Sequence, residues 1–393
     1  MRTITFSAIL ILAAASSFIR AEEGVTDKQI LIGSCSDQEG PTKQRGIEQK
    51  EAVEAFFSQV NKSGGIHGRK LKLVSHDDSY QVDKAPLCFN QLMKDGVFMG
   101  AFFIGSGPGV KYATMAETHK VPILGINGGP EFLYKPVKHY VFNIRSSYFD
   151  QAEQPIDHLW NDLNFKKIGV VYQNDAYGSA VLEGTNIALQ KRKSAPIVVA
   201  SFARPNKAGE IEGLSSVVQT VKAAAPDALI LGGVGAPDAK IVGELRKAGL
   251  QAIYVAVTND PKFYKSGENV EGAVMIQPFP PIERKDLRAV TEYSKTLKQS
   301  YPKSEATSVG LEAFVDAKVI AEALKRAGKD LTREAFIEAL ESMNSYDVGL
   351  GDGPEDKISF DSKDHKGLQK AYATVIKDNK PIILNDWKTL SKG

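Results

Sequence analysis

Residues 102–110 read Phe-Phe-Ile-Gly-Ser-Gly-Pro-Gly-Val, an apolar run that ends in a glycine-rich turn. A helix-like segment follows from Lys111 to His119. A buried strand that turns directly into a helix leaves free backbone N–H groups at the turn. Those N–H groups, with the hydroxyl of Ser106 beside them, favour binding of an anion or a carboxylate.

Similar turns follow other apolar runs, at residues 126–130, 174–178 and 232–237. Each of them could be no more than a connection, because every α/β fold needs such turns. Taken together, they indicate a ligand site at the carboxyl ends of parallel strands.

Apolar runs of strand length alternate with segments of helical spacing through most of the chain. The runs lie at 29–33, 71–74, 97–104 and 121–126, and again at 167–172, 197–200, 228–231 and 252–255. Such alternation predicts an α/β fold with parallel sheets and helices on both faces. The last third differs, with helical patterns at 287–301, 311–327 and 333–343, followed by strand-like stretches at 357–361 and 372–384.

The alternation begins again near Arg145, which predicts two Rossmann-like parallel-sheet lobes. We expect residues 24–144 and 276–347 in lobe 1, and residues 145–275 and 348–390 in lobe 2. The chain would then cross between the lobes near Arg145, Met275 and Val348, forming a three-crossover hinge.

The N-terminus and the charge balance limit where the protein acts. Arg2 precedes an apolar run from Ile4 to Ala15, and this pattern is typical of a secretory signal peptide over residues 1–21. Cleavage could follow Ala21 or fall near residues 15–17. The net charge of +2 comes without a basic stripe, so no nucleic-acid partner is expected.

Cys35 and Cys88 are the two cysteines of the sequence. In an exported protein they could form one disulfide, but their apolar surroundings fit two buried free thiols equally well.

Catalytic signatures are missing from the sequence. The dinucleotide fingerprint fails because Val110 stands where its last glycine is required. No phosphate loop, no Gly-x-Ser-x-Gly elbow and no histidine pair at metal-ligand spacing is present. We therefore expect no enzymatic activity, no cofactor and no metal.

Several motifs together resemble a known family. They are Asn-Lys-Ser-Gly-Gly-Ile-His-Gly-Arg-Lys-Leu at 61–71 with Asp77-Asp78 after it, Asn-Asp-Ala-Tyr-Gly at 174–178, and Leu-Arg-Lys-Ala-Gly-Leu at 245–250. Nearly the whole mature chain is similar to the periplasmic solute-binding proteins of the branched-chain amino acid (Leu/Ile/Val-binding) ABC transporter family. The resemblance implies the type I bilobed fold and a monomer in the periplasm. It also implies capture of an amino acid or related small carboxylate between closing lobes, and delivery to an ABC permease in the inner membrane.

The resemblance also implies a pocket. In lobe 1, Ser106 and Gly107 would bind the ligand carboxylate, and Asn127 and Gly128 would make further contacts. In lobe 2, Tyr177 supplies an aromatic side chain. The remaining pocket positions are Glu39 in the first turn, Phe149 on the hinge side, and Val234, Gly235, Thr258 and Asn259 in the later turns.

Two departures from the family pattern leave the ligand open. Val234-Gly235 stands where amino-acid binders often have a second aromatic, and Thr258-Asn259-Asp260 stands where they often have an acid for the ligand ammonium. A buried ammonium needs a paired charge or several acceptors. The ligand could therefore be an amino acid, a carboxylic acid without the amine, or a polar amide. The function also has alternatives. The second hypothesis, after transport, is a ligand sensor that presents its closed form to a receptor, and the third hypothesis is an enzyme on this scaffold.

Overall fold

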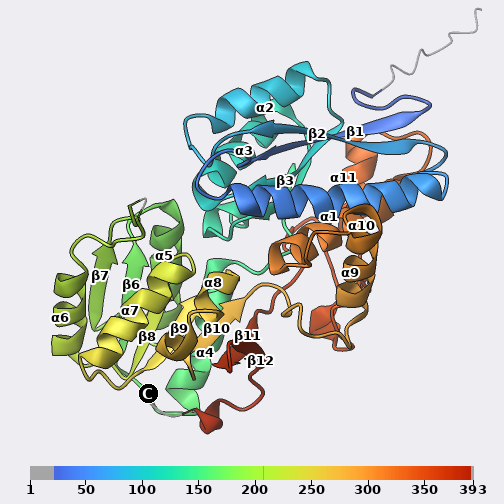
Figure 1. Ribbon diagram of the computed structural model, residues 1–393. Coiled ribbons are helices and arrows are strands. Elements are labelled where there is room, and N and C mark those ends of the chain that lie inside the picture. Colours follow the sequence, from blue (N-terminus) through green and yellow to red (C-terminus); the bar gives the residue numbers. More distant parts are fainter. Residues whose placement is uncertain (1–21, 207, 391–393) are drawn as a thin grey trace, which may run out of the picture.

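The computed structural model describes residues 22–206 and 208–390, so the predicted signal peptide over 1–21 lies outside the described residues. The chain forms two lobes, each built around its own sheet (Figure 1). The sheet of the first lobe is parallel throughout and has the order β2-β1-β3-β4-β5. Its strands are β1 (Gln29–Ser36), β2 (Lys70–Asp77), β3 (Met99–Ile104), β4 (Ile123–Asn127) and β5 (Val141–Phe142).

Helices cover both faces of this first sheet (Figure 1). On one face, Ile30, Ile32 and Leu124 pack with the buried sides of α1, α9, α10 and α11. On the other face, Phe103 and Ile126 pack with α2 and α3. The helices are α1 (Lys43–Lys62), α2 (Ala85–Lys94), α3 (Ser106–His119), α9 (Arg288–Ser300), α10 (Ser308–Ala327) and α11 (Arg333–Glu341).

The sheet of the second lobe has the order β12-β11-β10-β9-β8-β6-β7. It is parallel from β10 to β7, whereas β11 and β12 add an antiparallel hairpin at one edge. Its strands are β6 (Ile168–Gln173), β7 (Val198–Phe202), β8 (Ala228–Gly232), β9 (Ile253–Val257), β10 (Val274–Gln277), β11 (Tyr372–Lys377) and β12 (Lys380–Ile383). Its helices are α4 (Tyr148–Asn161), α5 (Ala176–Gln190), α6 (Leu214–Ala224), α7 (Ala236–Lys247) and α8 (Pro261–Tyr264). Short 3₁₀ turns complete the described chain at Glu131–Leu133, Gly267–Val270, Pro354–Asp356 and Trp387–Thr389.

The predicted α/β fold with two parallel-sheet lobes is confirmed. The last crossing differs from the expected position at Val348. Val348, Leu350, Ile358, Phe360 and Leu368 pack in the core of the first lobe, so the chain returns to the second lobe only at β11. The strand expected at 357–361 makes isolated bridges instead. Ile358 and Phe360 are buried and Ser359 is exposed, which explains the strand-like pattern without a partner strand.

A disulfide joins Cys35 at the end of β1 to Cys88 in α2. Of the two alternatives that the sequence left open, the structure has the bonded one. Among the described residues, no helix is long and apolar enough to cross a membrane.

Candidate functional site

A small cavity of about 60 Å³ lies between the lobes, at the carboxyl ends of strands from both sheets. Strands β3 and β4 lead into it from the first lobe, and β8 and β9 lead into it from the second. The residues that line it are Thr42, Arg45, Tyr80, Ile104, Gly105, Ser106, Asn127, Arg145, Tyr148, Gln151, Tyr177, Val234, Val257, Thr258 and Asn259.

The turn after β3 places Ser106 in this cavity. Gly105 precedes α3 with φ of 103°, a left-handed conformation that favours glycine. A Cβ at Gly105 would lie 2.4 Å from the ring of Tyr80, so this close approach also requires glycine. Ser106 begins α3, is buried, and its Oγ lies 3.2 Å from the hydroxyl of Tyr148 in α4 of the other lobe.

A cation and two amides connect the lobes. Arg45, in the first turn of α1, donates from Nη2 to the Oδ1 of Asn127 at 2.8 Å. The same Nη2 donates to the Oδ1 of Asn259, beyond β9 in the second lobe, at 3.1 Å. The Nδ2 of Asn127 in turn donates to Glu312 at 2.8 Å, and this second hydrogen bond fixes the orientation of the Asn127 amide.

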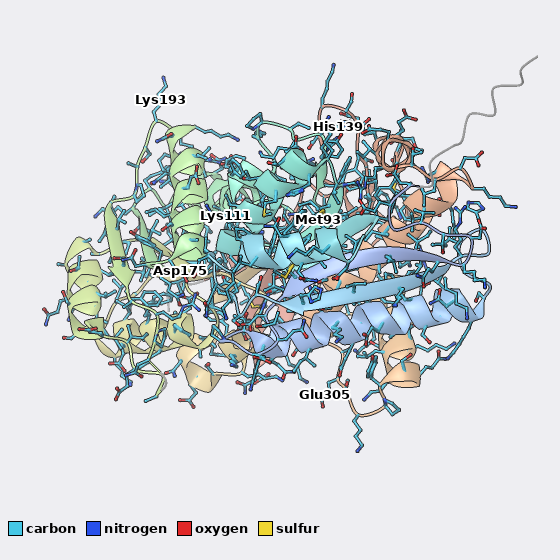
Figure 2. All side chains as sticks on the ribbon, turned by 90° about the horizontal axis from the view of Figure 1, so that it is seen from above. Met93, Lys111, His139, Asp175, Lys193 and Glu305 are labelled. Atoms are coloured by element: carbon cyan, nitrogen blue, oxygen red, sulfur yellow. A yellow bond between two sulfur atoms is a disulfide. The ribbon has the colours of Figure 1, made fainter. Side chains whose placement is uncertain are left out.

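The second lobe contributes an aromatic wall that its own backbone holds in place. Asp175 caps α5 by accepting the N–H groups of Tyr177 and Gly178, each at 3.0 Å. The hydroxyl of Tyr177 donates to the carbonyl of Val257, and its ring meets that of Tyr148 edge-on with centroids 5.3 Å apart. Asp175 also pairs with Arg204 at 2.7 Å, and Figure 2 shows Asp175 on the side of its lobe that faces the first.

Under the cavity lies a buried charge cluster. Arg145 is 5% exposed and donates from Nη1 to Glu312 at 3.2 Å. Burial is the main influence on Glu312 and raises its pKa, while Arg145 acts in the opposite direction. Burial, reinforced by the charge of Glu312, raises the pKa of Asp316 well above its usual range. The Nε of Arg145 is buried without a hydrogen-bond partner among the described residues.

Comparison with known proteins identifies the family. A family model described as "Periplasmic binding protein" matches residues 29–381. The chain belongs to the periplasmic binding proteins. The predicted resemblance to the branched-chain amino acid group and its type I fold is confirmed by the relatives described next.

Relatives of this periplasmic binding protein differ in the ligands that their names state. It is 23% identical over 326 residues to "Leu/Ile/Val-binding protein homolog 3" of Brucella melitensis, which covers 82% of this chain and 86% of the relative. A branched-chain amino acid ABC transporter structure from Thermus thermophilus with bound valine has a TM-score of 0.80 at 18% identity, covering 92% and 97% of the two chains. A fatty acid ABC transporter substrate-binding protein from Thermomonospora curvata has a TM-score of 0.79 at 23% identity, covering 92% and 93%.

Many of the pocket residues that we predicted for this binding protein line the cavity: Ser106, Asn127, Tyr177, Val234, Thr258 and Asn259. Their contact with a ligand stays a prediction.

The backbone glycines of the predicted pocket lie beside the cavity rather than in its lining. A Cβ at Gly107 would lie 3.3 Å from that of Ala176 in the other lobe, so Gly107 marks the line where the lobes touch. Gly128 packs against the backbone of Gly105 and Ser106. Gly235 packs against the side chain of Asp260.

Two predicted side chains lie elsewhere. Glu39 is exposed, and its backbone N–H donates to the carboxylate of Asp77 at 3.2 Å. Phe149 lies one residue too far along α4, and its ring packs under the ammonium of Lys191 at 4.2 Å. Tyr148 takes the predicted place of Phe149 in the cavity. Ser147 and Asp150 form a capping box at this helix start, and that Ser-x-x-Asp spacing was the signal in the sequence for the correct residue.

Sequence reasoning missed the two arginines of the cavity, Arg45 and Arg145. Arg45 lies in the first turn of the helix that follows the first strand, and a cation at such a helix start was a usable signal. Arg145 was recognised only as a crossing point. Its role depends on Glu312, which is distant in the sequence and for which the local pattern gave no signal.

Proposed function

We propose that this protein is the exported substrate-binding protein of an ABC importer. It captures an amino acid or a related small carboxylate between two closing lobes and delivers it to a membrane permease. The observation that carries the proposal is the cavity between the lobes, to which strand ends of both sheets contribute polar side chains. A ligand held there would be contacted from both sides, and its binding would favour the closed arrangement of the lobes.

The chemistry of the lining supports a carboxylate ligand. Ser106 at the start of α3 offers a hydroxyl and backbone N–H groups, and Arg45 offers a guanidinium. The rings of Tyr148 and Tyr177 can cover an apolar part of the ligand. The names of the relatives, which include Leu/Ile/Val-binding and fatty acid proteins, agree with ligands that carry a carboxylate.

A ligand screen tests the proposal. We expect the melting temperature of the purified mature protein to rise with one class among aliphatic amino acids, aromatic amino acids and their amine-free acids. At a ligand concentration of 100 times Kd, the gain is about 2.7 kcal/mol. Amides without a carboxylate serve as the control. If no carboxylate raises the melting temperature at millimolar concentration, the proposal is wrong.

Delivery and the absence of catalysis need separate measurements. Uptake of the labelled ligand by intact cells should fall when the protein is deleted and return when it is restored. Unchanged uptake would favour the sensing role instead. Nuclear magnetic resonance of the ligand after incubation with the protein should show the same compound, and a new product would indicate an enzyme.

A further inference from the structure

The guanidinium of Arg45 has no counter-charge in the cavity. Its Nη2 donates to two neutral amide oxygens, those of Asn127 and Asn259. In the described part of the chain, the structure records no ion pair for Arg45 and no hydrogen bond from its Nε or Nη1. A planar guanidinium with these donors still available suits a carboxylate, which it can bind through two parallel hydrogen bonds.

A second guanidinium increases the positive character of the cavity. The side chain of Arg145 is buried, with an exposure of 5%. Its Nε has no hydrogen-bond partner among the described residues. A buried unpaired donor on a charged group is costly. A ligand acceptor in this cavity would lie near both guanidinium groups, because Arg45 and Arg145 line the same space.

The acids near the cavity are already engaged. Both oxygens of Glu312 accept hydrogen bonds, one from Arg145 and one from Asn127. Asp316 lies one helical turn away on α10, where burial and the charge of Glu312 raise its pKa. Glu312 therefore forms its ion pair with Arg145, and no described carboxylate forms an ion pair with Arg45.

No Asp or Glu belongs to the described lining of the cavity. In the second lobe, Asp175 caps α5 and pairs with Arg204, and Asp260 accepts the backbone N–H of Lys262. The ammonium of a bound amino acid would thus meet only neutral acceptors in the described lining, next to two guanidinium groups. Such an unpaired buried charge is unfavourable.

We propose that the ligand is a small monocarboxylate without an ammonium group, and that Arg45 pairs with its carboxylate. This inference rests on the proposed function and narrows its ligand class. An anion neutralises the remaining charge of the cleft, whereas a zwitterionic amino acid leaves it in place.

Matched ligand pairs test this directly on the unaltered mature protein. In L-2-hydroxy-3-methylbutanoate a hydroxyl replaces the ammonium of L-valine, and L-phenyllactate relates to L-phenylalanine in the same way. Calorimetry on pairs with side chains from methyl to benzyl should give at least about tenfold tighter binding of the hydroxy acid. Equal or tighter binding of the amino acid would overturn the inference and leave the proposed function standing. Binding of neither member of any pair would overturn both.

Variants separate charge pairing from lobe closure, because Arg45 also bridges the lobes. Arg45→Gln should weaken hydroxy-acid binding by about tenfold or more. Lys43→Gln, an exposed change in the same first turn of α1, should leave it unchanged. Asn259→Ala removes the hydrogen bond between the lobes but keeps the guanidinium of Arg45. It should therefore weaken hydroxy-acid binding clearly less than Arg45→Gln does. If Asn259→Ala lost as much affinity as Arg45→Gln, Arg45 would act only by holding the lobes together. That result would overturn its pairing with the ligand carboxylate.

Discussion

Single side chains determine how firmly the cavity can hold an anion, and Ser106 is the one that the sequence already indicated. Its hydroxyl is buried and lies 3.2 Å from that of Tyr148. We expect Ser106→Ala to weaken ligand binding by about 1–3 kcal/mol, because in the proposed complex the hydroxyl contacts a charged carboxylate. Calorimetry measures this. Thr114→Ala, an exposed hydroxyl change on the same helix, is the control, and equal affinities of both variants would contradict the placement of the carboxylate.

Asp238 should make stability depend on pH. This carboxyl is fully buried at the start of α7, accepts the N–H of Gly233 at 3.1 Å, and leaves Oδ1 unpaired among the described residues. Burial raises its pKa from 3.8 to about 8. The folded chain thus binds this proton more tightly than the unfolded chain, so its contribution to stability is present below pH 3.8 and is lost as pH rises to about 8.

The test is urea unfolding between pH 5 and 8. Asp238→Asn should remove a decline on the order of a few kcal/mol over this range. Asp330→Asn, at an exposed position, should retain the decline. A decline that persists in Asp238→Asn would assign the pH dependence to other groups.

The residues of the site differ in how far the sequence could predict them. Ser106, Asn127 and Tyr177 lie at or just after strand ends, so the order of apolar runs and turns was enough to place their turns at one edge of the sheets. Arg145 could not be placed in this way, because its environment is a contact with Glu312 of α10 that only the folded core creates. Tyr148 lines the cavity in place of the predicted Phe149, because the face that a helical residue occupies depends on where the first turn begins.

Between secondary-structure elements, the disulfide is a covalent constraint. It joins β1 to α2 across 53 residues of sequence. We expect Cys35→Ala/Cys88→Ala to lower the free energy of unfolding by about 2–4 kcal/mol, because the unfolded chain regains the freedom of that loop. Denaturant unfolding measures the loss. A reductant should lower the stability of the unaltered protein similarly and leave the double variant unchanged. If it affects both proteins alike, the effect does not come from this bond.

The strands and helices were predicted well because each carries its own periodicity. Helices α9, α10 and α11 lie close to the ranges expected from helical spacing. Residues 357–361 were expected as a strand because alternating burial of Ile358 and Phe360 mimics one. A strand also needs a partner, and pairing is a tertiary property that a single segment does not reveal.

The complete chain should change between open and closed arrangements, and the contact between Gly107 and Ala176 provides a test. A Cβ added to Gly107 would lie 3.3 Å from the Cβ of Ala176, close to the separation across a disulfide. It would also lie 2.7 Å from Val82, whose side chain must move slightly. We therefore expect Gly107→Cys/Ala176→Cys to cross-link under mild oxidation, and to do so faster with bound ligand. Gel mobility without reductant measures the rate.

The single variant Gly107→Cys is the control for unrelated disulfide exchange. A cross-linking rate that does not respond to a ligand proven to bind would mean that closure is independent of the ligand. That result would contradict capture by closing lobes while leaving the binding site itself intact.

The first lobe is discontinuous, and this affects how a newly made chain can fold. Its core combines residues of β1, α1 and β3 with residues of α10, α11 and the segment that ends at Leu368. During synthesis and export, the apolar face of α1 stays uncovered until these late residues have been made. Strands β6 to β10 of the second lobe, by contrast, follow one another in the sequence. The first lobe begins the sequence but completes its core only at Leu368, shortly before β11 and β12 complete the second lobe. A nascent chain therefore exposes the apolar face of α1 to chaperones until late in synthesis.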